Sequence, residues 1–459
     1  MLNLDDFYRN AASFDELLSD DFFTDPALTI DPQRVRAMLS SWCDASGAGN
    51  SEAFVQRLAK DGWSLEFVSA RFAGARPKRS RIYPLWVRDA QWVFNNLQSI
   101  MSPLNTDSLS SSSGGDEVEL ILKELAQLCL EKCFPAQSNG SLPCLRDEAF
   151  SDLQETLVNE LRIICYKPFV DYFAGLVKVP SQIGNVKSCL AIDNYEQDAH
   201  IWPQTHLMKL FQLQPVLLRL IAVIVREWMS VTATLMKRIH EDKLLLQNRF
   251  SVTFDTAQVL RVFSISQTIK ILEYSNNKKI IYALQNCNLT QRIFDLLEQL
   301  NHYAPPIDLK YSNIIFCTDY YWLEVTEGTV SLDDSENAQL YERLGAWMAL
   351  FYVLAGSHFD DAEFLSVGEY PLPLEIQCLF QSDTIDQGSA SSPHDEPSQA
   401  PEGVNNAIGQ ISSLPLTLFR TDETFSKLDQ HFDYLLDGFK KYLIFVMVCR
   451  DKVGLNGLL

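Results

Sequence analysis

Apolar residues recur every three or four positions through the first half of the chain, the spacing of one face of an amphipathic helix. This period covers residues 34–42, 52–60, 82–100, 118–132, 150–177 and 215–250. Asp61-Gly62 ends the second of these segments. Pro215 suits the first turn of the last one, because its missing N–H costs no hydrogen bond there. We therefore expect a helical N-terminal half.

Near Val259 the period changes to short apolar segments bounded by polar turns, the pattern of β-strands. Residues 268–274 and 279–284 are separated by Ser-Asn-Asn-Lys and predict a β-hairpin. Further strands are expected at 312–318, 321–325 and 372–380, and helices at 290–300, at 335–354 with Ser335 as the cap, and at 425–448. The predicted fold class is α+β, predominantly helical.

Two stretches have neither period and are rich in small and polar residues. Residues 102–117 are rich in Ser and Gly, which predicts a flexible loop. Residues 381–410 are rich in Ser, Pro, Gly, Gln and Asp, which predicts a mobile insert. With 459 residues the chain is long enough for two or three domains. We expect a helical domain over 1–255, an α+β core over 256–380, the insert, and a C-terminal helical segment over 411–459.

The charge balance is acidic, with 38 Lys and Arg against 59 Asp and Glu, a formal net charge of −21. A phosphate backbone repels such a chain, so nucleic acid is not an expected partner. The N-terminal residues lack the apolar core of a signal peptide. The longest apolar run, 216–225, contains Arg219 and is too short to span a bilayer. We expect a cytoplasmic protein without membrane insertion.

The ten cysteines are scattered, and no pair has CxxC spacing. Cys129 and Cys133 are four residues apart, as on one face of a helix, but no Cys or His cluster completes a zinc ligand set. We interpret the cysteines as buried, reduced thiols and expect no zinc.

Short motifs along the chain carry a more specific signal. They are Phe54-Val-Gln-Arg-Leu-Ala-Lys-Asp-Gly62, Gln214-Pro-Val-Leu-Leu-Arg219 with Trp228 and Leu244, Lys279-Ile-Ile-Tyr282, Tyr341-Glu-Arg-Leu-Gly345, Gly368-Glu-Tyr-Pro371, and Tyr434-Leu-Leu-Asp-Gly-Phe439 with Arg450-Asp451. In this order they resemble motifs of the dehydratase domain of LanM-type (class II) lanthipeptide synthetases. The family's F-x-x-R-L-A-x-D-G helix end and its G-E-H-P turn are among them.

The resemblance implies an α+β lobe with a fold similar to lipid kinases. The order of hairpin, helix, strands, helix, acidic loop and strand agrees with a kinase. The family's domain binds ATP and Mg²⁺, phosphorylates Ser and Thr of a precursor peptide and then eliminates the phosphate, and a separate C-terminal cyclase holds zinc. This chain stops at Leu459, before the positions of the family's elimination residues, so we expect the end of the domain to be missing.

The resemblance also assigns positions to the chemistry, and the chain departs from the family at nearly all of them. The family's phosphate-binding Lys corresponds to Ala283. Its D-x-H-x-x-N catalytic loop places Asp, His and Asn at His358, Asp360 and Glu363, and its D-L-E metal strand corresponds to Glu375-Ile376-Gln377. Lys279 could supply the lost charge only in a different pocket, since four residues of strand span roughly 13 Å. We interpret these positions as the remnant of a site, either in a pseudoenzyme whose fold is kept for binding or in a gene fragment that is losing its function.

Three hypotheses follow. The first is a non-catalytic LanM-like protein that binds a precursor peptide or a lanthipeptide synthetase subunit and needs no cofactor. The second is an active dehydratase subunit completed in trans, which would use ATP and Mg²⁺, carboxylates such as Glu375 and Glu363 for the cation and His358 as a base. The third is an unrelated helical adaptor, which would lack a five-stranded lobe between residues 259 and 380.

Overall fold

The computed structural model describes residues 2–25, 27, 32–45, 51–78, 82–101, 115–134, 145–177, 202–250, 259–266, 268–274, 278–285, 287–310, 313–325, 334–354, 364–367, 369–373, 418–419 and 428–449. The chain divides into two compact units, Met1–Leu142 with Phe150–Arg238, and Pro143–Ala149 with Ile239–Leu459. The insert predicted at 381–410 lies outside the described residues, as do residues 102–114 of the predicted loop. The domain boundary predicted after residue 255 stays a prediction.

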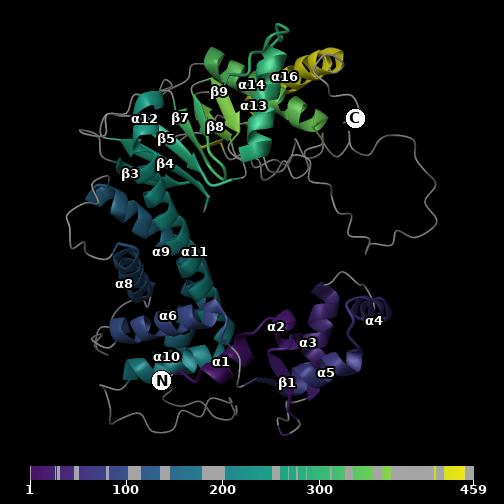
Figure 1. Ribbon diagram of the computed structural model, residues 1–459, viewed down its shortest axis with the longest axis vertical. Helices are drawn as coiled ribbons and strands as arrows, with labels where there is room; N and C mark the ends of the chain where they lie inside the picture. The colour runs from purple at the N-terminus through teal and green to yellow at the C-terminus, as the bar shows by residue number, and fades with distance from the viewer. Residues whose placement is uncertain are drawn as a thin grey trace. The chain divides into compact units, whose positions relative to one another are not determined.

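The first unit is built mainly from helices, as its hydrophobic period predicts (Figure 1). They are α1 (Leu4–Ala11), α2 (Phe14–Leu18), α3 (Pro32–Ala45), α4 (Ser51–Lys60), α5 (Leu65–Gly74), α6 (Leu85–Met101), α8 (Gly115–Cys133), α9 (Asp147–Val177), α10 (Trp202–Leu213) and α11 (Pro215–Glu241). A short antiparallel pair, β1 (Phe22–Thr24) and β2 (Ala75–Pro77), lies where only helices were expected. Each strand is three residues long and the two are far apart in sequence, so no local pattern of apolar residues predicts them.

The end of α4 explains the glycine of the first motif. Gly62 has a φ of +82°, which favours a residue without Cβ. The Trp63 N–H donates to the Leu58 carbonyl at 2.9 Å, and the Gly62 N–H to the Ala59 carbonyl at 3.2 Å. This is the Schellman arrangement, which satisfies carbonyls that the helix end leaves without partners.

The arginine of the second motif also has a structural contact. Ser13 and Glu16 form a capping box at the start of α2. The Trp86 indole N–H donates to Glu16 at 2.7 Å, and Arg219 of α11 donates to Glu16 and, at 2.8 Å, to the Ala11 carbonyl. Burial alone would raise the pKa of Glu16, but the hydrogen bonds from Ser13, Trp86 and Arg219 hold it below its ordinary value.

The second unit contains a five-stranded antiparallel sheet in the order β3-β4-β5-β7-β6 (Figure 1). Its strands are β3 (Val259–Ser264), β4 (Ile269–Tyr274), β5 (Lys279–Ala283), β6 (Ile314–Phe316) and β7 (Tyr321–Val325). Its helices are α12 (Lys243–Phe250), α13 (Cys287–Asn301), α14 (Asp334–Val353) and α16 (Leu428–Cys449), and a second sheet joins β8 (Phe364–Val367), β9 (Tyr370–Pro373) and β10 (Leu418–Phe419). The predicted fold class, α+β and predominantly helical, is confirmed.

Three local predictions need correction. Residues 115–117 were expected in the flexible loop, but they belong to α8. Ser335 was expected to cap its helix, but α14 already begins at Asp334, so Ser335 lies in the first turn. The strand expected at 372–380 begins earlier, at Tyr370, and its described part ends at Pro373. The register with β8, in which Val367 is opposite Tyr370, fixes that start. Such pairing is a tertiary contact that the apolar pattern does not contain.

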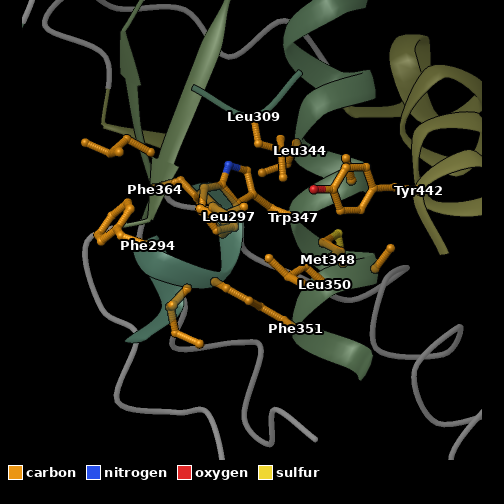
Figure 2. Close-up of a cluster of buried hydrophobic side chains, with 14 of the residues drawn as sticks. Phe294, Leu297, Leu309, Leu344, Trp347, Met348, Leu350, Phe351, Phe364 and Tyr442 are labelled. Carbon is orange, nitrogen blue, oxygen red and sulfur yellow. The ribbon is translucent and has the colours of Figure 1, made fainter. Parts of the chain in front are cut away.

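The two faces of the five-stranded sheet differ in environment. Ile269, Ile281 and Leu323 belong to a buried core shared with α13, α14 and α16. Figure 2 shows this core, with Phe294 and Leu297 near Trp347 and Phe351 of α14, and Phe364 and Tyr442 beside them. On the opposite face, the indole N–H of Trp322 donates to Asp242 at 2.7 Å. Ala283, the position assigned to the phosphate-binding Lys, lies on the core face opposite Ile269.

The helices α14 and α16 lie side by side (Figure 1), and their backbones approach closely at two glycines. A Cβ added at Gly345 would lie 2.0 Å from the Leu435 carbonyl oxygen, and one added at Gly438 would lie 1.9 Å from the Glu342 carbonyl oxygen. Only glycine permits this approach of backbone to backbone. We call this contact the glycine seam, and both of its glycines belong to motifs of the resemblance.

Candidate functional site

The position assigned to the phosphate-binding Lys lies in the apolar core. Ala283 is the last residue of β5 and is fully buried. Its cross-strand partners are Ile269 on β4 and Tyr321 on β7, both also buried. A methyl group in this environment offers no charge to a phosphate.

The neighbouring helix α13 offers no charge on its buried face either. In protein kinases the Lys of the third strand pairs with a Glu on the helix that follows. The buried residues of α13 are Cys287, Thr290, Ile293, Phe294, Leu297 and Leu300. Its acidic residues, Asp295 and Glu298, are exposed. Residue 283 and the buried face of α13 therefore carry neither the Lys nor the Glu of such an ion pair.

Two lysines on β4 and β5 are the candidates to replace the charge lost at Ala283. Lys279 begins the same strand, where it is half-buried and opposite Glu273 and Val325. Lys270 lies on β4 opposite Tyr282, on the other face of the sheet from Ala283. Neither ammonium group lies at the position of the Ala283 methyl.

Lys270 instead holds the turn between β3 and β4. Its buried ammonium group donates to the Ser264 hydroxyl and to the Ser266 carbonyl, both at 2.9 Å. The hydroxyls of Ser266 and Thr268 are 3.2 Å apart, and the Leu284 N–H donates to the Thr268 carbonyl at 2.8 Å. In kinases the corresponding hairpin is a Gly-rich loop that covers the phosphates. Here the turn bonds to its own strands.

The remaining candidate residues lie outside the described part of the chain. They are His358, Asp360, Glu363, Glu375 and Gln377. Their roles stay predictions. The structure describes the β8–β9 hairpin, which lies in the sequence between His358, Asp360 and Glu363 on one side and Glu375 and Gln377 on the other.

A charged cluster surrounds the turn of this hairpin, and we call its members, Asp308, Lys310, Arg343 and Tyr370, the Tyr370 cluster. The Tyr370 hydroxyl accepts from Lys310 at 2.7 Å and from Arg343 at 3.1 Å, and donates to Asp308 at 3.2 Å. Arg343 also donates to the other oxygen of Asp308 at 3.2 Å and to the Glu369 carbonyl at 3.0 Å. The guanidinium carbon lies 3.9 Å from the centre of the Tyr370 ring.

The electrostatics of the Tyr370 cluster follow from these contacts. Burial alone would raise the pKa of Asp308, but hydrogen bonds from Lys310 and Arg343 and their charges hold it below its ordinary value. Hydrogen bonds with Tyr370 and Asp308 raise the pKa of Lys310. Arg343 and Tyr370 belong to quoted motifs, whereas Asp308 and Lys310 carry no motif and were missed by sequence reasoning.

Of the seven cysteines that the structure describes, four are buried as expected, Cys129, Cys165, Cys287 and Cys449, and three are half-buried, Cys43, Cys133 and Cys317. Cys129 and Cys165 are buried, and burial raises the pKa of each to about 12. Burial raises the pKa of Cys133 to about 11, and its thiol lies 3.7 Å from the Met229 carbonyl. These thiols are protonated at neutral pH. Among the described residues, no group of His, Cys, Asp and Glu is arranged to hold a metal ion.

No single helix in the described part of the chain is long and apolar enough to cross a membrane. One bent pair, Leu207–Leu213 with Pro215–Glu241, passes that test on length and composition, with a bend of 101°.

These features define a predominantly helical α+β protein whose second unit carries a five-stranded antiparallel sheet. Residues 214–432 match a family model described as "Domain of unknown function (DUF4135)". The match begins at Gln214, the first residue of the second motif, and includes the sheet, α13, α14 and the Tyr370 cluster. A search of the curated proteins finds no match to the chain.

Proposed function

We propose that the chain is a LanM-like dehydratase-domain protein that binds a precursor peptide or a lanthipeptide synthetase subunit and does not transfer phosphate. The observation that carries the proposal is Ala283, buried in an apolar core at the position where the resemblance requires a phosphate-binding Lys. Part of this proposal is that the protein acts in the cytoplasm without a cofactor.

The order of the elements supports the kinase-like part of the proposal. Three consecutive strands, β3, β4 and β5, form a meander, α13 follows, and β6 and β7 complete the sheet. In protein kinases the third strand carries the Lys and the next helix carries its Glu. The five-stranded sheet also counts against the helical-adaptor hypothesis, which required that no such lobe exist.

The motif residues support the non-catalytic part. Gly62 ends a helix, Arg219 holds the capping box of α2, Gly345 forms the glycine seam, and Arg343 holds Tyr370. Each of these contacts stabilises the fold, and none of them needs a nucleotide. The resemblance is thus strongest at scaffold positions and weakest at Ala283.

The residues near Ala283 do not fit a nucleotide phosphate. A phosphate in a partly desolvated site needs cations or N–H donors to offset its charge. The sheet positions next to Ala283 on this face are two isoleucines, Ile269 and Ile281, and the buried Tyr321, and none of them carries a positive charge. The proposed function therefore does not include phosphoryl transfer.

The first test is thermal denaturation of the full chain with and without 5 mM ATP and Mg²⁺. A ligand that binds the folded state at ten times its Kd stabilises it by about 1.4 kcal/mol, which is a measurable shift in Tm. We expect no shift. A shift that ADP also produces and that Glu375→Ala abolishes would refute the proposal and support the active-subunit hypothesis.

The second test addresses binding. A fluorescently labelled class II precursor peptide and a purified synthetase would each be titrated with the chain by fluorescence anisotropy. A scrambled peptide of the same composition is the matched control. We expect one of the two partners to bind at micromolar concentration and the scrambled peptide not to bind. Failure of both partners at 100 µM, roughly ten times a typical transient Kd, would overturn the binding role.

A further inference from the structure

The Tyr370 cluster joins segments that are far apart in the sequence. Asp308 and Lys310 follow α13, Arg343 lies within α14, and Tyr370 lies at the turn of the β8–β9 hairpin. Leu309, between the two charged residues, is buried in the core near Leu344 (Figure 2). The cluster therefore joins the segment that follows α13 to α14 and to the β8–β9 hairpin.

The hydrogen bonds of this junction depend on one another. A tyrosine hydroxyl has one proton to donate and two lone pairs to accept with, and the three bonds at Tyr370 use all of this capacity. The side chain of Arg343 is 10% exposed, so its charge needs its acceptors. Asp308, at 48% exposed, reaches solvent as well. Loss of the Tyr370 hydroxyl removes a partner from all three of the other members.

We propose that the Tyr370 cluster is a lock that fixes residues 302–310, the segment that follows α13, to α14 and to the β8–β9 hairpin without a bound nucleotide. The sheet, α13 and α14 already share a buried core, and the cluster adds the contacts that hold this segment at its edge. Arg343 and Tyr370 are positioning residues for a hairpin whose first strand directly follows Glu363 and whose second ends two residues before Glu375. One part of this inference rests on the proposed function, namely that the lock works without a nucleotide.

The test is native-state hydrogen exchange of the full chain, read peptide by peptide for the wild type and for Tyr370→Phe. We expect exchange to rise about tenfold in residues 302–310 and in β8–β9, the size of one lost hydrogen bond to charged partners. Peptides of the glycine seam in α14 and α16 should keep their wild-type rates, because that contact does not use Tyr370. The matched control is Tyr434→Phe, which removes a half-exposed phenol on α16 and should change nothing.

Two further variants keep the lock falsifiable if Tyr370→Phe folds poorly. Asp308→Asn retains a half-exposed side chain but loses the charge, and should loosen the same peptides. Tyr370→His, the residue of the family turn, offers a ring and a polar N–H and should restore part of the protection. A uniform rise across the second unit, or no rise in residues 302–310, would overturn the lock.

The wild type is also measured with ATP and Mg²⁺ added. Unchanged exchange supports a lock that works without nucleotide. Protection that appears only with nucleotide would refute the proposed function and the nucleotide independence of the lock. The exchange of Tyr370→Phe without nucleotide would then decide separately whether the junction holds the two parts together.

Discussion

The glycine seam between α14 and α16 gives the sharpest test of the fold, through the substitution Gly345→Ala. An ideal Cβ there would lie 2.0 Å from the Leu435 carbonyl oxygen and 2.7 Å from the Phe439 nitrogen. Both atoms belong to the backbone, so no side chain can rotate away. The two helices would have to separate by more than an ångström before the contact became tolerable, since real Cβ contacts stay above 3.0 Å.

Two effects of opposite sign decide the outcome. Replacing glycine by alanine inside a helix raises its intrinsic stability by about 1 kcal/mol. Overpacking costs about 1–3 kcal/mol and more where the backbone must move. A gap of 0.5–1 Å also forfeits roughly a quarter to a half of each dispersion contact along the seam. The clash therefore wins, and we expect Gly345→Ala to lower the free energy of unfolding by about 2 kcal/mol.

The assay is urea unfolding combined with native-state hydrogen exchange of the α14 and α16 peptides. Gly62→Ala is the matched control, because Gly62 has a φ of +82° but nothing within 4 Å of an added Cβ. That control should cost about 1–2 kcal/mol of backbone strain and leave the seam peptides unchanged. If Gly345→Ala proved as stable as the wild type, the close approach of α14 and α16 would be wrong.

Three other predictions concern single side chains. The folded-state pKa of Glu16 is lowered, so this carboxylate stabilises the fold above its unfolded pKa of 4.5 and loses that effect as pH falls through the folded value. In urea unfolding at pH 7, Glu16→Gln should lower the free energy of unfolding by about 1–3 kcal/mol, and the difference from the wild type should vanish in acid. A difference that stayed constant with pH would contradict this. The Tyr442 hydroxyl is buried without a hydrogen-bond partner among the described residues, and its pKa is raised by burial and, to a smaller extent, by Cys449. Tyr442→Phe should leave the free energy of unfolding unchanged or raise it by about 1 kcal/mol. A clear drop in Tm would show that the hydroxyl has a partner outside the described residues. Ala283→Lys would bury an ammonium group in the core and should lower the free energy of unfolding by about 3 kcal/mol or more. Ala283→Met, which adds a side chain of similar length without a charge, should lower it less. A stable Lys variant that gained ATP binding would show that this position opens to a cleft.

Much of the fold could be predicted because its signals are local. The helical period located most of the helices, and the apolar segments at 269–274 and 279–283 located β4 and β5. These predictions succeeded because an element that buries one face has its apolar residues at regular spacing. The strand β3 was marked only as a change of pattern near Val259. Its alternation is weak, with Arg261 and Phe263 exposed at the sheet edge. The candidate site was predicted only through the resemblance, and the roles assigned to its six positions stay predictions.

The sequence by itself determined the helical period, the acidic charge, the motifs and the absence of a Lys at residue 283, since each of these is a property of residues close together in the chain. Only the tertiary structure decided that Ala283 faces a sealed apolar core, that Lys270 points to the other face, and that Asp308 meets Arg343 and Tyr370. Such contacts depend on strand pairing and helix packing between distant segments. The energy of those contacts is shared among many residues, so no short stretch of sequence encodes them.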